Sequence, residues 1–280
     1  MGTLRYGASA ALVIIGIAST FLLGELPSGE DAFEILFLSI TVFVGGVGLF
    51  NWGFGRFRRL QLVRDTPTQK IRSMSMGTVE VKGDAGVVSQ KFQTPITNTE
   101  CVYYEYKVEE YQSDGDDSHW ETIDNGKTSE PIGVDDGTGA AVVEVSEAEI
   151  ELPDEDYQEK LDGGEEPPQH IQNFIDQNDN VKEGNNEMLT IFDNDRRFTE
   201  YYIQPGDHLY VFGYAEEERR EDGTSYPVIK EGQAPMFYVT DKTEEYLRNR
   251  WGWTYKAMLL GGIILIPLGY MMMAGMMGMM

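Results

Sequence analysis

Apolar residues along the chain gather in three uncharged runs, and a long polar region separates the second run from the third. Each run approaches or exceeds the roughly 17 to 25 residues that a helix needs to cross a hydrocarbon core of about 30 Å. Pro267 in the third run is compatible with such a helix, because neighbouring helices or water can satisfy the carbonyl that a proline frees. We therefore expect three transmembrane helices, over residues 8–24, 35–55 and 257–280.

The first run has a second interpretation, because Arg5 followed by a short apolar stretch is also the pattern of a secretory signal. No small-residue cleavage motif follows Leu23, however, and a short polar turn leads directly into the second run. We therefore favour a retained helix that forms a hairpin with residues 35–55.

The polar region shows the alternation of apolar and polar residues that is typical of β-strands. The segments with this pattern are 77–83, 101–111, 140–152 and 208–217. Clusters of Gly, Asp and Pro predict turns at 82–86, 135–139, 204–207 and 221–227. The acidic stretches 113–121 and 153–168 predict solvated loops; a bound divalent cation is the alternative, although neither stretch has the ligand spacing of a calcium loop.

Helical spacing occurs in two segments of the polar region. Residues 167–178 place Ile171, Phe174 and Ile175 on one face, after two prolines that suit a helix start. Residues 240–251 predict a short amphipathic helix that leads into the third apolar run. The predicted fold class is membrane-anchored α+β, in which a β-rich domain (56–256) is inserted between an N-terminal transmembrane hairpin (1–55) and a C-terminal transmembrane helix (257–280).

Cations are concentrated just after the second apolar run, whereas the loop between the first two runs holds acidic residues and no cation. These topology residues are Arg56, Arg58, Arg59 and Arg64. Short loops rich in Lys and Arg stay on the cytoplasmic side of a membrane. We therefore expect a multi-pass protein of the cell membrane, with its N-terminus and its main domain in the cytoplasm.

The charge balance narrows the choice of partners. The 280 residues carry 47 acidic and 22 basic side chains, for a formal net charge of −25 and a pI near 4.4. This charge argues against nucleic acid as a partner, and we interpret it as adaptation to concentrated salt, in a halophilic archaeal cell. The expected partners are the lipid bilayer and other membrane or cytoplasmic proteins, and the sequence leaves the oligomeric state open.

The residue types that carry chemistry are scarce, with one cysteine and three histidines in the whole chain. No metal-ligand spacing, phosphate-binding loop or nucleophile elbow occurs. Cys101 follows Glu100, whose negative charge would raise the thiol pKa, so we expect a structural cysteine. We predict no catalytic, cofactor or metal site. Seven of the last ten residues are methionine, which leaves Cu(I) binding as an alternative to a lipid-compatible helix.

Three motifs in the polar region resemble the GIDE family, which includes the mitochondrial ubiquitin ligase MULAN and whose domain is also called "beside a membrane". The first motif, T-x-x-x-I-R-x-x-x-x-G-x-V-E-V-x-G, is matched by Thr68, Ile71, Arg72, Gly77, Val79, Glu80, Val81 and Gly83. The second is the C-V-Y-Y strand, with Cys101, Tyr103 and Tyr104, and the third is the turn Pro205, Gly206 and Asp207. The resemblance covers about residues 65–240.

The resemblance implies an E3 ubiquitin ligase, but the family's ligase activity belongs to a RING domain that follows the last membrane helix. A RING binds two zinc ions through eight Cys or His ligands, and this sequence contains four such residues. We therefore expect a prokaryotic member that lacks the RING domain and acts as a membrane-anchored binding or scaffold protein. The alternative is an E3 transferase of ubiquitin or a ubiquitin-like protein, or a subunit that presents substrates to one.

Overall fold

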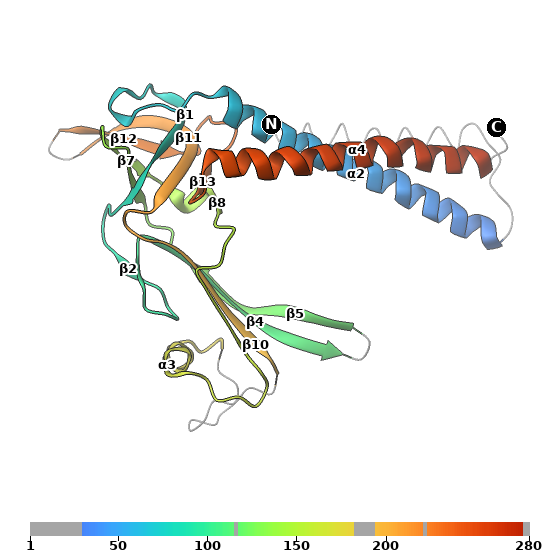
Figure 1. The fold of residues 1–280 in the computed structure, drawn as a ribbon, viewed down its shortest axis with the longest axis horizontal. Helices are drawn as coiled ribbons and strands as arrows, with labels where there is room; N and C mark the ends of the chain where they lie inside the picture. Colours follow the sequence, from blue (N-terminus) through green and yellow to red (C-terminus); the bar gives the residue numbers. More distant parts are fainter. Residues whose placement is uncertain (1–29, 115–116, 182–193, 221–222, 277–280) are drawn as a thin grey trace. The chain divides into compact units, whose positions relative to one another are not determined.

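The computed structural model describes residues 30–114, 117–181, 194–220 and 223–276, so the helix predicted at 8–24 lies outside the described residues (Figure 1). The chain is α+β, with a β-rich middle and two long apolar helices. It divides into two compact units: residues 1–65 with 244–280, and residues 66–243.

The described part of the first unit is a pair of helices, α2 (Glu30–Asp65) and α4 (Glu244–Met276). They lie side by side and antiparallel, because Gly53 packs beside Met258 and Gly46 beside Ile266 (Figure 1). A Cβ atom at Gly46 would lie 2.8 Å from the backbone nitrogen of Ile266. Glycine therefore permits the close helix approach that is common in membrane helix pairs. Both helices are long and apolar enough to cross a membrane.

The second unit contains two main sheets and one short helix. Its first strands are β1 (Gly77–Gly86), β2 (Phe92–Gln93), β3 (Glu100–Cys101), β4 (Tyr103–Asp114), β5 (Asp117–Lys127), β6 (Ile132–Asp135) and β7 (Ala140–Val143). The later strands are β8 (Glu149–Glu151), β9 (Tyr157–Leu161), β10 (Arg196–Ile203), β11 (His208–Arg219), β12 (Ser225–Lys230) and β13 (Tyr238–Thr240). The helical segments are η1 (Ile71–Ser73), η2 (Val145–Glu147) and α3 (Gln169–Gln177).

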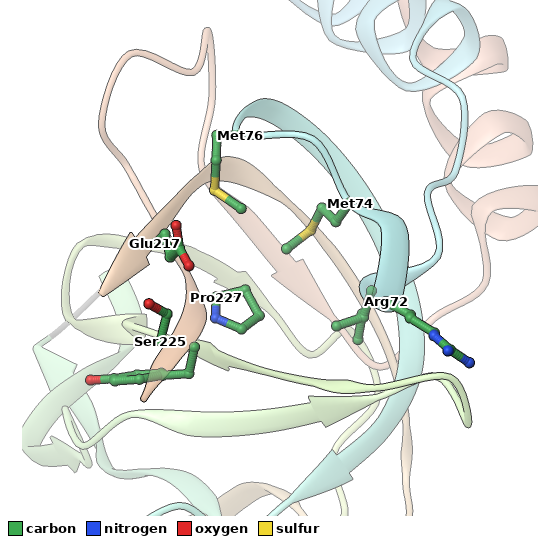
Figure 2. A pocket seen from close by; sticks show the side chains of 8 residues that line it. Arg72, Met74, Met76, Glu217, Ser225 and Pro227 are labelled. Carbon is green, nitrogen blue, oxygen red and sulfur yellow. The ribbon is translucent and has the colours of Figure 1, made fainter. Parts of the chain in front are cut away.

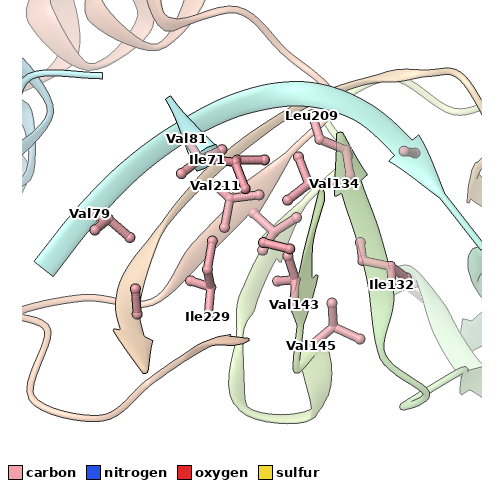
Figure 3. Packing of buried hydrophobic residues seen from close by; sticks show 14 of the residues in the cluster. Ile71, Val79, Val81, Ile132, Val134, Val143, Val145, Leu209, Val211 and Ile229 are labelled. Atoms are coloured by element: carbon pink, nitrogen blue, oxygen red, sulfur yellow. The ribbon is translucent and has the colours of Figure 1, made fainter. Parts of the chain in front are cut away.

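Strand β1 closes the larger sheet into a barrel, because it pairs with β6 on one side and with β11 on the other. The barrel order is β1-β6-β7-β12-β11, and β13 and β8 extend the sheet beyond β11. Side chains from these strands and from the preceding segment fill the interior (Figure 3). Val79, Val81 and Val211 are among the residues with no exposed surface. This core holds the motif strand β1 in place.

The smaller sheet has the order β5-β4-β10-β9 and is covered on one face by α3. The predicted helix at 167–178 is confirmed, and its apolar residues Ile171, Phe174 and Ile175 pack against the buried Val108 and Phe198. The spacing of three and four residues puts the three side chains on one helix face, and that face is the one buried.

Five sequence-based predictions in this unit need correction. The turn predicted at 221–227 is shorter, because residues 225–227 belong to β12. The cluster at 82–86 is part of β1 and not a turn, because β1 changes partner from β11 to β6 at Asp84 and continues to Gly86. The acidic stretch 113–121 lies largely in the β4–β5 hairpin, and the stretch 153–168 contains β9, so neither is simply a loop. The strand predicted at 140–152 is divided into β7, η2 and β8.

Candidate binding site

Strand β1 carries a buried carboxylate, since Glu80 is 1% exposed. Thr68 Oγ1 donates a hydrogen bond to Glu80 Oε1 at 2.5 Å, and the Tyr210 hydroxyl donates one to Oε2 at 2.8 Å. The ammonium group of Lys82 lies 3.1 Å from Oε1. Burying a carboxylate is costly unless hydrogen bonds and an opposite charge compensate. The motif residues Thr68 and Glu80 therefore belong to one compensated network that fixes β1 to the preceding segment.

That preceding segment, residues 66–76, is called the arm here, and it connects α2 to the barrel. Its backbone continues along β1, where Gln69 N donates to Glu80 O at 2.8 Å. The side chain of Ile71 is buried in the barrel core. Arg72 contributes its backbone N–H, which lies 3.4 Å from Thr138 Oγ1, while its side chain is exposed. The motif pair Ile71-Arg72 therefore anchors the arm over the β6–β7 turn.

Asp136 in the β6–β7 turn holds the same part of the arm. Its Oδ2 accepts a hydrogen bond from Ile71 N at 3.1 Å and lies 3.7 Å from Lys70 Nζ. Burial alone would raise the pKa of Asp136, but hydrogen bonds from Thr138 and Ile71, with the charge of Lys70, lower it to about 2. Asp136 is therefore ionised at ordinary pH and holds the arm as a carboxylate.

Glycines in the first and third motifs occupy places that a larger residue cannot take. A Cβ atom at Gly83 would lie 2.4 Å from the carbonyl oxygen of Asp135. Gly77 and Gly206 have positive φ angles of 121° and 94°, which non-glycine residues rarely adopt. These three glycines have conformational or packing roles.

The Pro205-Gly206-Asp207 turn joins β10 to β11 and docks on the end of β1. Asp207 N donates to Gln204 O at 3.1 Å, and the positive φ at the third turn position is that of a type II turn. Gly206 N donates to Ala85 O at 2.8 Å, and Ala85 N donates to Asp207 O at 2.7 Å. The first and third motifs thus meet at β1, although more than 100 residues separate them.

The C-V-Y-Y motif connects the two sheets. Cys101 has no exposed surface, and burial together with the charges of Glu200 and Glu100 raises the pKa of its thiol to about 12. Tyr103 is fully buried in the barrel core, and its hydroxyl donates to Glu105. Tyr104 O accepts a hydrogen bond from Thr128 N at 3.0 Å. The protonated, inaccessible thiol supports a structural role for Cys101.

Two buried charges were missed by sequence reasoning. Glu200 has no exposed surface, and its carboxylate accepts hydrogen bonds from Ile96 N at 2.6 Å and from Thr97 Oγ1 at 2.6 Å. Arg196, 3% exposed, donates to Glu110 Oε2 through Nη2 at 2.6 Å. The two carboxylates, of Glu110 and Glu200, lie in β4 and β10, and no local pattern gives the distant partners that bury them.

The predicted topology residues all lie in the C-terminal part of α2. Arg56 Nη1 donates to Thr254 Oγ1 on α4 at 3.1 Å, and the guanidinium lies 5.8 Å from the centre of the Trp52 ring. Arg58 and Arg64 are exposed, and Arg59 is half-buried. Because the helices are antiparallel, this cationic end of α2 lies beside the beginning of α4, which contains further cations: Arg248, Arg250 and Lys256.

A small open pocket of about 170 Å³ lies between the arm and the β11–β12 hairpin (Figure 2). Its lining residues are Ile71, Arg72, Met74, Met76, Glu217, Ser225, Tyr226 and Pro227. Figure 2 shows Pro227 between Glu217 and Met74, whereas the guanidinium of Arg72 extends away from these residues. The pocket involves two residues of the first motif, Ile71 and Arg72, and its lining is mixed: apolar side chains lie beside the polar groups of Arg72, Ser225, Tyr226 and Glu217.

Within the described ranges, no three His, Cys, Asp or Glu side chains are placed to hold a metal ion. His170 Nε2 lies 2.7 Å from the Tyr157 hydroxyl and 3.3 Å from Glu159 Oε2, but this group is half-exposed and joins α3 to β9. The residues of the first and third motifs have positions in the arm, in β1 and in the turn between β10 and β11.

Comparison with protein-family models matches residues 102–275 to the family GIDE, described as "E3 Ubiquitin ligase". The match covers more than half of the chain and includes the C-V-Y-Y strand from Val102, the Pro205-Gly206-Asp207 turn and most of α4. It begins after the arm and β1, so the first motif lies outside it. No curated protein and no solved structure matches the chain.

Proposed function

Because the chain belongs to the GIDE family, we propose that it is a membrane-anchored binding or scaffold protein that acts at the cytoplasmic face of the membrane. The proposal places the β-rich unit next to the bilayer, held at both ends by helices that leave the same membrane face. Such tethering raises the effective concentration of the unit toward other membrane proteins, in the way that linked modules gain avidity. The proposed partners are the bilayer and other membrane or cytoplasmic proteins, not nucleic acid.

The observation that carries the membrane proposal is the outward apolar surface of the α2–α4 pair. Trp253 is 76% exposed, Phe37 66% and Ile264 62%, although glycines bring the two helices into close contact. In a water-soluble protein such large apolar side chains would be buried. Lipid is the solvent in which this surface is stable, as expected for helices that are apolar all round.

The cationic ends of the helices support the orientation. Arg56 contacts α4 through Thr254, so the Arg-rich end of α2 and the beginning of α4 lie together. A pair of membrane helices with both cationic ends on one side satisfies the rule that Lys and Arg stay in the cytoplasm. The β-rich unit is covalently connected to these same two ends, which favours a cytoplasmic location for it.

Catalysis is proposed to belong to a separate protein. The 280 residues contain one Cys and three His, fewer than the eight ligands of a RING domain, and the only thiol is buried and protonated. The family description favours a second candidate function, in which this chain is an E3 transferase of ubiquitin or a ubiquitin-like protein, or a subunit that presents substrates to one. The charge of −25 further supports a halophilic, archaeal setting for either function.

Purification from native membranes tests the proposal. The full chain carrying an affinity tag is purified from salt-adapted membranes, and its partners are quantified against a membrane protein carrying the same tag. A scaffold should recover a defined set of membrane or cytoplasmic proteins without a modifying enzyme. Recovery of a ligase, with loss of modified substrates on deletion of the gene, would favour substrate presentation. A chain that alkaline carbonate extracts from the membrane would contradict both.

A further inference from the structure

The pocket between the arm and the β11–β12 hairpin has the size of a side-chain site. Its volume of about 170 Å³ is smaller than the roughly 300 to 1,000 Å³ of pockets that hold cofactors or drug-sized ligands. Met74 is buried at 8% exposure and forms a wall, whereas Met76 is 52% exposed at the rim. Methionine side chains adapt to irregular partners. The pocket is therefore suited to one long, flexible side chain.

Glu217 is the acidic residue that lines this pocket, and it is exposed. Glu216, Glu217 and Glu218 follow one another in β11, so successive side chains point to opposite faces. The Lys230 ammonium lies 2.6 Å from a carboxylate oxygen of Glu216 and 3.4 Å from one of Glu218. Lys230 therefore offsets the negative charge on the face of β11 that carries these two residues. Glu217 lies across from Pro227 on the other face, and among the described residues its carboxylate has no hydrogen bond or ion pair.

The backbone next to the pocket limits the way in which a partner can bind. Strand β12 pairs with β11 along its length, but with β7 only at Val228 and Ile229, so the stretch Ser225–Pro227 has one free edge. Pro227 has no N–H to donate, and proline at an edge opposes the addition of another strand. Recognition here must use side chains and not main-chain pairing.

We propose that this pocket binds a lysine or arginine side chain of another protein. The aliphatic stem contacts Met74, Met76 and Pro227, and the cationic head pairs with Glu217 and donates to the Ser225 hydroxyl. Long basic side chains bury their methylene stems in this way while the head keeps a polar partner. The inference rests on the proposed binding function and names the chemistry of the partner: a basic residue at an exposed position.

Methyl NMR of the full chain in lipid nanodiscs tests the pocket directly. The probes are the peptides acetyl-Gly-Ser-Xaa-Ser-Gly-amide with Lys, Arg, norleucine or Glu at Xaa, and Met74→Leu and Met76→Leu identify the two methyl signals. We expect saturable shifts of both signals with Lys or Arg, about fivefold weaker binding of norleucine, and no saturable shift with Glu.

Two neighbouring variants give a matched control. Glu217→Gln should weaken binding of the Lys peptide about fivefold, whereas Glu216→Gln on the opposite face should change it less than twofold. Equal effects of the two variants, or equal binding of Lys and norleucine peptides, would overturn the proposal. Shifts that appear with protein concentration and no peptide would overturn it in favour of a second copy. None of these results alters partner recovery from membranes, so the binding function is tested separately.

Discussion

Thr68 and Glu80 are joined twice, by a parallel β-bridge between their backbones and by a hydrogen bond of 2.5 Å from the Thr68 hydroxyl to the buried carboxylate. Thr68 lies three residues after the end of α2, and Glu80 lies in the middle of a barrel strand. The connection from helix to barrel is therefore held at a defined position a few residues after the helix.

Removing the Thr68 hydroxyl should destabilise the protein. Thr68→Val leaves one lone pair of a buried carboxylate without its donor, which costs about 1 to 3 kcal/mol of unfolding free energy. Thr68→Ser retains the donor and should cost less than half as much. Denaturant unfolding of the full chain in detergent, followed by near-ultraviolet circular dichroism, measures both variants. Equal stability of the Val and Ser variants would show that the hydroxyl contributes nothing.

Gly83 and Gly86 provide a comparison within one strand. A Cβ atom at Gly83 would approach Asp135 O to 2.4 Å, whereas one at Gly86 would be 3.7 Å from its nearest neighbour, Gly133 Cα. We expect Gly83→Ala to cost about 1 to 3 kcal/mol through overpacking against backbone, and Gly86→Ala to be close to neutral. The same unfolding measurement compares them, and a tolerated Gly83→Ala would mean that β1 and β6 separate easily.

The arm should loosen only in strong acid. The pKa of Asp136 is lowered from 3.8 to about 2 in the folded protein, so its contribution to stability is complete above the unfolded value and is lost as the pH falls through the folded value. Wild-type stability should therefore show a decrease between about pH 4 and pH 2 that is smaller in Asp136→Asn. If the unfolding free energy of the two proteins depended on pH in the same way, the stabilising role of the Asp136 carboxylate would be contradicted.

Adjacent glycines in α2 test the helix pair. Gly46 is in close contact with Leu265 and Ile266, whereas Gly45 has no atom within 4 Å of the position where its Cβ would be. Gly46→Ala should lower the midpoint of thermal unfolding in detergent, because the helices must move apart. Gly45→Ala should leave it unchanged or raise it slightly, since alanine has the higher helix propensity. A reversed order would contradict the packing of α2 on α4.

Local pattern was sufficient to predict the two apolar helices that the structure describes and several strands. The alternation around Val79 and Val81 identifies β1, and the spacing of Ile171, Phe174 and Ile175 identifies α3. The same alternation gives no sign that Glu80 is buried. Its partners Thr68 and Tyr210 come from the arm and from β11, the latter 130 positions away. Burial of a charge depends on such distant partners, which a single sequence does not reveal.

In the acidic stretches, too, the single sequence did not reveal the effect of distant partners. Residues 113–121 and 153–168 have the composition of loops, yet both contain strand because they pair with neighbouring strands, β5 with β4 and β9 with β10. Trp120 in the first stretch, for example, also contacts Arg197 of β10, whose guanidinium carbon lies 4.6 Å from the centre of the indole ring. The pocket likewise combines residues of the arm with residues of β11 and β12. The sequence around Arg72 gave no indication that Glu217, far away in the chain, would line the same pocket.

Membrane topology is the central claim, and cysteine labelling tests it most directly. The only native thiol, Cys101, is buried with a raised pKa and should not react in the folded protein. Ser28→Cys, in the loop between the first two apolar runs, and Ser89→Cys, on the exposed surface after β1, are each treated in intact cells with a membrane-impermeant maleimide. The account predicts labelling of Ser28→Cys in intact cells and of Ser89→Cys only after lysis. Labelling of Ser89→Cys in intact cells would contradict it.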